Sequence, residues 1–301
     1  MVNQKSISPL IILSYLKAYL HQLNHMKTSQ ILFTASLLLA AVTANAQHSL
    51  TQIWATEASL PVPESVFYSA KDKLLYVAQI DGKPGEKDGK GAIGKVGLDG
   101  KIINKDWVTG LHAPKGMGVM GNKLFVSDVT DVVEIDIKSG KILKKHAVEG
   151  AVFLNDVTID AEGKIYVSDS STKKVHLIKD GKVSTYLEGL NGPNGLLAVG
   201  SDLLVADAGT LKRVSATKEV TTIAEGMDKS TDGIEQVVPG EYLVSCWAGV
   251  VYYVKSDGTK QELLNTSADK TNSADIGYDS VKKIVYVPTF AKNGVVAYQL
   301  K

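Results

Sequence analysis

The stretch FLNDVTIDAEGKIYVSDS, residues 153–170, decides the fold of this chain. Two segments rich in β-branched and apolar residues, 157–159 and 164–168, flank the turn dipeptide Glu162-Gly163. This pattern predicts an antiparallel hairpin. The first strand nevertheless opens with Asn155-Asp156, although amides and carboxylates are depleted in strand interiors. A polar start to a buried strand requires an explanation.

The same pattern occurs six times along the chain. Its copies start 38 to 51 residues apart, at Glu64, Lys115, Asn155, Asn194, Asp232 and Ala274. Two further short strands follow in most copies, such as KKVHLIK and KVSTYLE on either side of Asp180-Gly181. Four strands per repeat, at a period of about 40 residues, predict an all-β protein, a six-bladed β-propeller with four-stranded antiparallel blades. The last copy has only three strands, so residues 50–58 (LTQIWATEA) are expected to complete it and close the ring.

The first 46 residues are predicted to lie outside the propeller domain, which spans residues 50–301. From Met26, the sequence MKTSQILFTASLLLAAVTANAQ has the basic start, the apolar run and the Ala44-Asn45-Ala46 ending of a secretory signal peptide. Residues 26–46 are therefore interpreted as a signal peptide cleaved after Ala46, and residues 1–25 as an extension from a start codon assigned too far upstream. The alternative is one long signal or an anchor. The mature chain is expected to be periplasmic or secreted, without a membrane span.

The bulk composition excludes several classes of partner. Acidic and basic residues nearly balance, at 32 and 33, so no basic surface for nucleic acid is expected. Cys246 is the only cysteine, which excludes an internal disulfide and a cysteine-based metal cluster. A small-molecule substrate is the expected partner, and the sequence does not predict the oligomeric state.

Blade geometry explains the polar strand starts. The first strand of each blade is innermost, so its first residue is expected at one mouth of the central channel. Four of these six residues offer side-chain oxygens, namely Glu64, Asn155, Asn194 and Asp232. Each one alone is better explained as an ordinary residue where a loop enters a strand. Together they predict a hard-cation site, with Ca²⁺ as the first choice and Mg²⁺ or Mn²⁺ as alternatives.

The motifs around these residues resemble the regucalcin/gluconolactonase family of six-bladed propellers, which is related to paraoxonase-like lactonases. The resemblance covers residues 50–301 and is carried by PESVFY, LNDVTID, PNGLLA and TDGIEQ. It implies metal ligation by Glu64, Asn155, Asn194 and Asp232, with Asp232 also acting as the general base.

Two departures from the family pattern change the expected substrate site. Phe153 stands where sugar lactonases of the family have a substrate-binding Arg, and Lys115 stands where paraoxonases have a His. Lys115 is interpreted either as a functional group, which binds a substrate carboxylate or stabilises developing negative charge in catalysis, or as a side chain that extends into a wet channel mouth. The candidate pocket residues are Lys115, Phe153, Trp247, Phe290 and Asp275.

A second repeated position ends the second strand of each blade and carries Gln79, Asp128, Asp169, Asp207, Cys246 and Thr289. We expect the three aspartates there to accept backbone N–H bonds from loops rather than to bind metal. Residues 80–94 form a Gly-rich insertion, which is either a lid over the site or a solvated loop.

The sequence therefore predicts a divalent-metal-dependent hydrolase that acts on lactones or related esters. The alternative is a non-catalytic propeller that binds a sugar, a peptide or a partner protein and contains a structural cation, because the fold alone does not fix a function.

Overall fold

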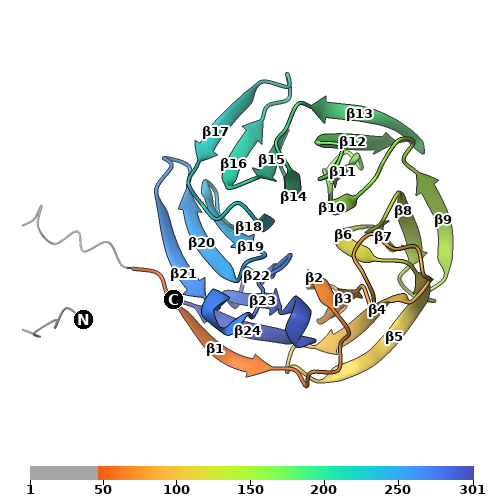
Figure 1. Cartoon of the computed structure of the whole chain (residues 1–301), viewed down its shortest axis with the longest axis horizontal. Coiled ribbons are helices and arrows are strands. Elements are labelled where there is room, and N and C mark those ends of the chain that lie inside the picture. The colour runs from red at the N-terminus through yellow and green to blue at the C-terminus, as the bar shows by residue number, and fades with distance from the viewer. Residues whose placement is uncertain (1–46) are drawn as a thin grey trace, which may run out of the picture. The chain divides into compact units, whose positions relative to one another are not determined.

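The computed structural model describes residues 47–301, of which His48–Lys301 form one compact unit. The predicted extension at 1–25 and the predicted signal peptide at 26–46 lie outside the described residues. Six four-stranded antiparallel sheets surround a central axis (Figure 1), so the prediction of a six-bladed β-propeller is confirmed. Among the described residues, no helix is both long enough and apolar enough to cross a membrane.

The strands of blades 1 to 5 follow one another in sequence from the axis outward (Figure 1). Blade 1 contains β2 (Pro63–Ser69), β3 (Leu74–Gln79), β4 (Gly91–Gly97) and β5 (Ile102–Leu111). Blade 2 contains β6 (Pro114–Met120), β7 (Lys123–Asp128), β8 (Asp131–Asp136) and β9 (Ile142–Ala147). Blade 3 contains β10 (Leu154–Ile159), β11 (Ile165–Asp169), β12 (Lys174–Lys179) and β13 (Lys182–Glu188).

Blade 4 contains β14 (Pro193–Val199), β15 (Asp202–Asp207), β16 (Thr210–Val214) and β17 (Val220–Ala224). Blade 5 contains β18 (Thr231–Val238), β19 (Glu241–Cys246), β20 (Val250–Lys255) and β21 (Lys260–Asn265). Blade 6 contains β22 (Gly277–Asp279), β23 (Ile284–Pro288), β24 (Val295–Leu300) and β1 (Leu50–Ala55). Two short 3-10 helices, η1 (Ser267–Asp269) and η2 (Phe290–Lys292), lie in loops.

The predicted hairpin of residues 153–170 is confirmed as β10 and β11. Val157 pairs with Val167 and Ile159 with Ile165. Gly163 occupies the left-handed region, at φ 79°, and its N–H donates to the carbonyl of Asp160 at 3.0 Å. Glycine adopts this backbone conformation without the steric cost that a side chain imposes, which explains why the turn forms there.

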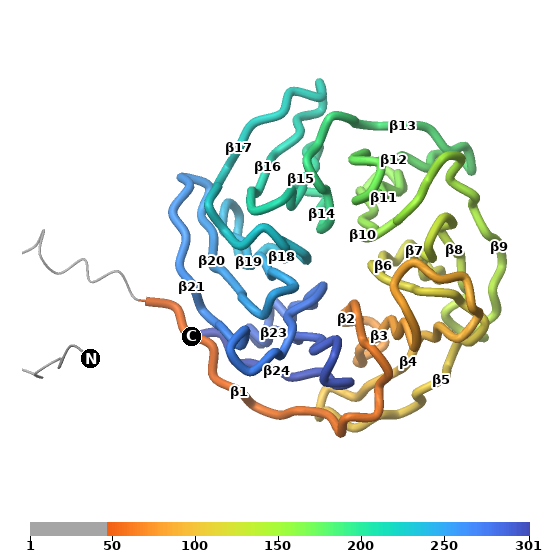
Figure 2. The backbone as a smooth tube through the Cα atoms, viewed as in Figure 1, coloured from red at the N-terminus to blue at the C-terminus, as the bar shows by residue number. Residues whose placement is uncertain are grey.

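The ring is closed between residues from the two ends of the described chain. β1 pairs antiparallel with β24, and Leu50 lies opposite Leu300, which confirms the predicted closing strand. Figure 2 shows the tube leaving β1 and returning beside it at β24. Near the axis, Val66 N–H donates to the Asp275 carbonyl at 3.1 Å, and Asp275 N–H donates to the Glu64 carbonyl at 3.0 Å. Closure therefore involves both the outer edge of blade 6 and its inner segment.

The hydrophobic core lies between blades. Six clusters of buried side chains each combine residues from two neighbouring blades, so that every blade contacts apolar neighbours on both faces. One cluster joins Tyr76 of blade 1 to Leu124 of blade 2, and another joins Val66 of blade 1 to Tyr286 of blade 6. A strand with both faces covered is expected to be a continuous apolar run, as in LYVA of β3, which is fully buried.

Glycines permit the inner strands to approach one another closely. A Cβ atom added to Gly195 would lie 1.8 Å from the Asp232 carbonyl oxygen in the next blade. An added Cβ would lie 2.1 Å from Asp156 Oδ1 at Gly116, and 2.3 Å from Asp275 Oδ1 at Gly233. Contacts this short require the backbone to shift, so only glycine fits at these three places.

We predict that Gly195→Ala lowers the free energy of unfolding by at least about 2 kcal/mol, because overpacking a rigid site forces backbone displacement. Gly192→Ala is the matched control, since its nearest contact to an added Cβ is 3.9 Å away, and its effect should stay within about 0.5 kcal/mol. Chemical denaturation of both variants measures the difference. Equal stability of the two would contradict the close-approach argument.

Candidate functional site

Aspartates at the end of the second strand hold the loops that lead into the inner strands. Asp128 Oδ1 accepts backbone N–H bonds from His112 at 2.9 Å and Ala113 at 2.8 Å. Asp169 accepts from Val152 at 2.8 Å and Phe153 at 3.3 Å, and Asp207 accepts from residues 191 and 192 at 2.9 and 2.7 Å. The prediction that these aspartates cap loops is confirmed. They fix the segments just before Lys115, Asn155 and Asn194.

Bulges at the starts of the inner strands set the direction of the first side chains. The strand register shifts between Leu154 and Val157 in blade 3, and shifts at the equivalent place in blades 1, 2, 4 and 5. A bulge places extra residues on one strand and re-aims their side chains. Asn155 and Asp156 consequently line two different cavities along the axis.

Five of the six predicted ring residues gather around one cavity of about 310 Å³: Glu64, Lys115, Asn155, Asn194 and Asp232. The sixth, Ala274, is fully buried but does not line this cavity. We call the cavity the mouth site. The convergence of side chains from five blades is the arrangement that the sequence predicts.

Three buried oxygens at the mouth site have no hydrogen-bond partner among the described residues: Glu64 Oε2, Asn194 Oδ1 and Asp232 Oδ1. Leaving a buried polar atom unsatisfied costs on the order of 1–3 kcal/mol, so a cation or a hydrogen-bond donor bound among these three oxygens would be stabilised. The Asn155 side chain is oriented by its Nδ2, which donates to Ser170 Oγ at 3.1 Å. The Ser170 hydroxyl in turn donates to the Pro193 carbonyl at 2.7 Å.

Two buried carboxyl groups of the mouth site, Glu64 and Asp232, have raised pKa values. Burial raises the pKa of Glu64 to about 8, with Lys115 acting in the opposite direction and Asp275 adding to the rise. Burial and the nearby carboxyl groups, first Glu64 and then Asp275 and Asp156, raise the pKa of Asp232 well above its ordinary value. Burying carboxylates together disfavours their charged forms, and a bound divalent cation would reverse this effect.

These donors fit a hard cation. The predicted set supplies two carboxylates and two amide oxygens, the ligand types that calcium accepts in irregular shells. No group of three His, Cys, Asp or Glu side chains arranged for metal binding occurs within residues 47–301. A site of the zinc type, which relies on His and Cys ligands, is therefore not formed in the described part of the chain.

Lys115 is the single basic side chain that lines the mouth site. It is only 1% exposed, and its Nζ donates to the Ala113 carbonyl at 3.0 Å. The ammonium also lies 4.4 Å from the centre of the Phe153 ring, within the range of a cation–π interaction. Burial lowers the pKa of Lys115, whereas Glu64 and Asp128 act to raise it. The side chain is buried and does not extend to solvent.

An apolar wall completes the mouth site, and it consists of Ile80, Pro84, Phe153, Trp247 and Phe290. The rings of Trp247 and Phe290 meet edge to face, with centroids 5.5 Å apart. The backbone of Phe290 has a φ of 45°, a conformation that costs a non-glycine residue about 1–3 kcal/mol. Such strain is most common at functional sites.

The insertion after β3 forms part of this wall. It joins β3 to β4 on the side of the mouth site, as predicted, but its last four predicted residues (91–94) belong to β4. Lys87 Nζ donates to Thr130 Oγ1 at 2.5 Å, and Gly89 N–H donates to His112 Nδ1 at 3.1 Å. The loop is thus tied to blade 2, and Pro84 faces the cavity.

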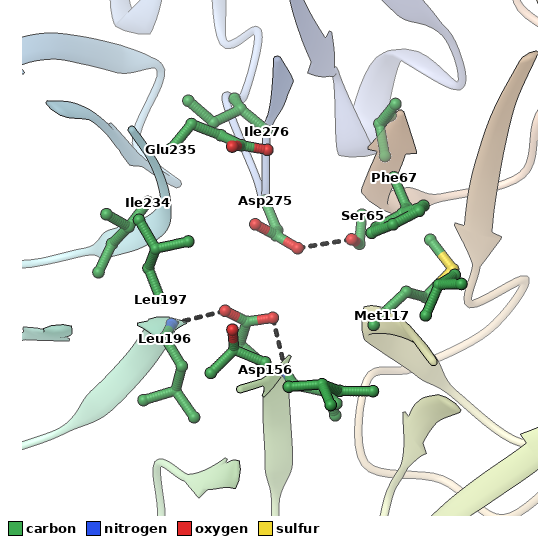
Figure 3. Close-up of a pocket in the computed structure, with 16 residues that line it drawn as sticks. Ser65, Phe67, Met117, Asp156, Leu196, Leu197, Ile234, Glu235, Asp275 and Ile276 are labelled. Carbon is green, nitrogen blue, oxygen red and sulfur yellow. Dashed lines mark hydrogen bonds between the residues drawn. The ribbon is translucent and has the colours of Figure 1, made fainter. Parts of the chain in front are cut away.

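Asp275 does not line the mouth site. It lines a second cavity of about 210 Å³ along the axis, where its carboxylate faces that of Asp156 (Figure 3). Asp275 Oδ2 accepts from Ser65 Oγ at 2.5 Å, and Asp156 accepts from the backbone N–H of Leu196 and Val157, each at 2.6 Å. Its place one residue after the ring position turns the Asp275 side chain away from the mouth, so Asp275 is not a substrate-pocket residue at the mouth.

Ser230, Ile80 and Pro84 also line the mouth site. The sequence did not predict Ser230, and it placed Ile80 and Pro84 only within the insertion at residues 80–94. Ser230 stands two residues before Asp232, as Phe153 stands two residues before Asn155. This repeated offset is a signal that could have identified Ser230. Pro84 carries no such signal, because it lies in the insertion that only blade 1 contains.

Neither a protein-family model nor a curated protein matches this sequence. Among solved structures, one described as a streptogramin B lyase has a TM-score of 0.64 at 12% identity, covering 84% of this chain and 98% of its own. A candidate gluconolactonase has a TM-score of 0.63 at 15% identity, covering 85% of this chain and 93% of its own. A chain of a nidogen/laminin complex has a TM-score of 0.58 at 18% identity, covering 72% and 85%.

At these identities the comparisons show a shared fold. Propellers of this shape include proteins described as a lyase, a candidate lactonase and a member of a protein–protein complex. The resemblance to the regucalcin/gluconolactonase family therefore stays a prediction, and the function must be argued from the site.

The second cavity predicts a pH-dependent stability. Burial and the charge of Asp275 raise the pKa of Glu235 to about 8, so the folded protein retains a proton that the unfolded chain releases above its ordinary value of 4.5. Stability should therefore fall as the pH rises from about 4.5 to about 8. Glu235→Gln removes this contribution.

Thermal unfolding in the presence of a chelator tests this expectation. Glu235→Gln should melt above the parent protein at about pH 8.5, with the difference shrinking toward about pH 5. Glu149→Gln, at an exposed position, is the control and should follow the parent at every pH. A constant offset for Glu235→Gln would contradict the assigned cause.

Proposed function

We propose that this protein is a divalent-metal-dependent hydrolase that opens lactones or related esters at the mouth site. The observation that carries the proposal is the set of three unpartnered buried oxygens, from Glu64, Asn194 and Asp232, around one cavity. Oxygen atoms buried together without donors are costly, and a hard cation would satisfy all of them at once.

Glu64, Asn155, Asn194 and Asp232 would hold the cation. We propose Ca²⁺, because two carboxylates with two amide oxygens suit its flexible coordination of six to eight oxygens. Mg²⁺ and Mn²⁺ are the alternatives. The bound ion would supply Lewis-acid polarisation of the substrate carbonyl.

Asp232 is the proposed general base. One oxygen of its carboxylate, the buried Oδ1, would bind the ion, and the other would accept a proton from the water that attacks the acyl carbon. The acyl C–O bond then breaks, and the leaving oxygen takes up a proton. Lys115, on the same cavity, would stabilise the negative charge that develops.

A non-catalytic propeller with a structural cation is the alternative use of the same residues. The polar and apolar parts of the mouth site favour a small molecule over a macromolecular partner, because the cavity of about 310 Å³ has the size of a small-ligand pocket. We further propose a periplasmic or secreted location, on the basis of the predicted signal sequence.

Metal analysis and a lactone panel test the proposal. The purified mature chain should bind about one Ca²⁺ and hydrolyse at least one lactone, and the chelator should abolish both. Glu64→Gln combined with Asp232→Asn should reduce calcium affinity and hydrolysis by at least about 100-fold, since ligand oxygens of full charge are lost.

Glu149→Gln combined with Asp106→Asn makes the same chemical change at exposed positions and should leave both properties intact. If no lactone is opened faster than by the Glu64 and Asp232 double variant, the catalytic claim fails. Calcium binding that persists in the parent protein would then favour the non-catalytic alternative.

A further inference from the structure

The mouth site is chemically divided. Its metal-facing part consists of Glu64, Asn155, Asn194 and Asp232, whereas the rest of the lining is apolar except for Lys115 and Ser230. The Ser230 hydroxyl is already committed, because it donates to Asp228 Oδ1 at 2.5 Å and accepts from Ala248 N–H at 2.9 Å. Away from the oxygen ligands, Lys115 is the one charged side chain of the lining, and its ammonium and the indole N–H of Trp247 are the donors left for a ligand.

The apolar part of the lining is too extensive for a polyhydroxylated ligand. Each sugar hydroxyl loses its water on entering the cavity and needs a replacement hydrogen bond. Phe153, Trp247 and Phe290 present rings, and Ile80 and Pro84 present aliphatic surface. Such a wall suits an aromatic or branched aliphatic group, which gains about 25 cal/mol for each Å² of apolar surface removed from water.

Lys115 adds a requirement for negative charge. An ammonium has three N–H donors, and the hydrogen bond that the structure shows for Lys115 Nζ goes to the Ala113 carbonyl. With a divalent ion on the two carboxylates Glu64 and Asp232, the charges of the mouth site sum to one positive unit, which Lys115 contributes. A buried charge is unfavourable unless it is paired, so an anion is the complementary ligand.

We infer that the mouth site is specific for lactones or esters with an apolar body, and that Lys115 holds the carboxylate released on opening while Phe153 excludes sugar lactones. This inference rests on the proposed function. In the reaction, water adds across the acyl C–O bond, with OH bonding to the acyl carbon and H to the ring oxygen. The acid formed then loses a proton and carries one negative charge, which pairs with Lys115.

Phe153 contributes both to the preference for an apolar body and to the position of Lys115, which binds the carboxylate. Its ring lines the apolar wall and also lies under the Lys115 ammonium, at 4.4 Å from the ring centre to Nζ. Gly85 of the insertion also approaches it, because a Cβ added there would lie 3.8 Å from the ring. Phe153 is therefore the position at which a polar replacement should change ligand preference most.

Calorimetric titration of the calcium-loaded protein tests binding without turnover. The probes are 4-hydroxy-4-phenylbutanoate, its neutral amide and gluconate. The phenyl acid should bind at least about 10-fold more tightly than either of the others. Lys115→Met should reduce affinity for the acid at least about 10-fold and leave the amide unchanged, because only the charge pair is lost.

Phe153→Arg should reverse the preference between the phenyl acid and gluconate, and Ile103→Arg, at an exposed position on β5, should not. Thermal unfolding of each variant verifies that it is folded. Equal or tighter binding of gluconate by the parent protein overturns the inference, as does an unchanged preference in a folded Phe153→Arg variant.

The two proposals fail in different ways. Selective binding of the phenyl acid without hydrolysis of any lactone of the panel, γ-phenyl-γ-butyrolactone included, would support the inferred ligand preference of the mouth site and contradict the hydrolase proposal. Faster hydrolysis of glucono-δ-lactone than of the phenyl lactone would support a hydrolase and overturn the inferred specificity.

Discussion

The close approach of the inner strands at the axis is the constraint on which the rest of this structure depends. At Gly195 the next blade comes so near that an added Cβ would lie 1.8 Å from a backbone oxygen. This proximity brings ring residues from five blades into one cavity. The first and the last of them, Glu64 and Asp232, are more than 160 positions apart in sequence. It also excludes water from them, so that carboxyl groups such as Glu64 and Asp232 have raised pKa values. The geometry of the ring thus places buried carboxyl groups close together, and a bound cation would stabilise their charged forms.

The parts of each blade outside the axis keep the inner strands and the ring residues in position. The cores between neighbouring blades hold the inner strands at fixed distances, and Asp128, Asp169 and Asp207 hold the loops just before the ring positions. Hydrogen bonds between blades add to this rigidity: Ser245 Oγ accepts from Gly233 N–H at 2.8 Å and donates to the Ala274 carbonyl of the next blade at 2.8 Å. A site built from rigid elements keeps its ligands in place before the ligand arrives.

Much of this architecture could be predicted from the sequence because the propeller repeats. The period gave the number of blades, the shortened last copy gave the closing strand, and the shared strand starts gave the convergence of Glu64, Asn155, Asn194 and Asp232. The placement of Asp275 could not be obtained in this way. Successive residues at an inner strand start, such as Asn155 and Asp156, face different cavities, and a repeat pattern does not show which cavity Asp275 lines. Pro84 was placed in the insertion at residues 80–94 but not in the cavity wall, because a segment found in one blade has no equivalent to compare.

The pairing of β1 with β24 has a consequence for how the molecule is made. The two strands are separated by almost the whole described chain, and the sixth blade has only three strands until both are present. A nascent or truncated polypeptide that lacks Val295–Leu300 leaves the edge of β1 without its partner, and an uncovered strand edge invites aggregation or proteolysis. The ring therefore closes only when both strands are present, so β24 is required for the fold although it lines no part of the mouth site.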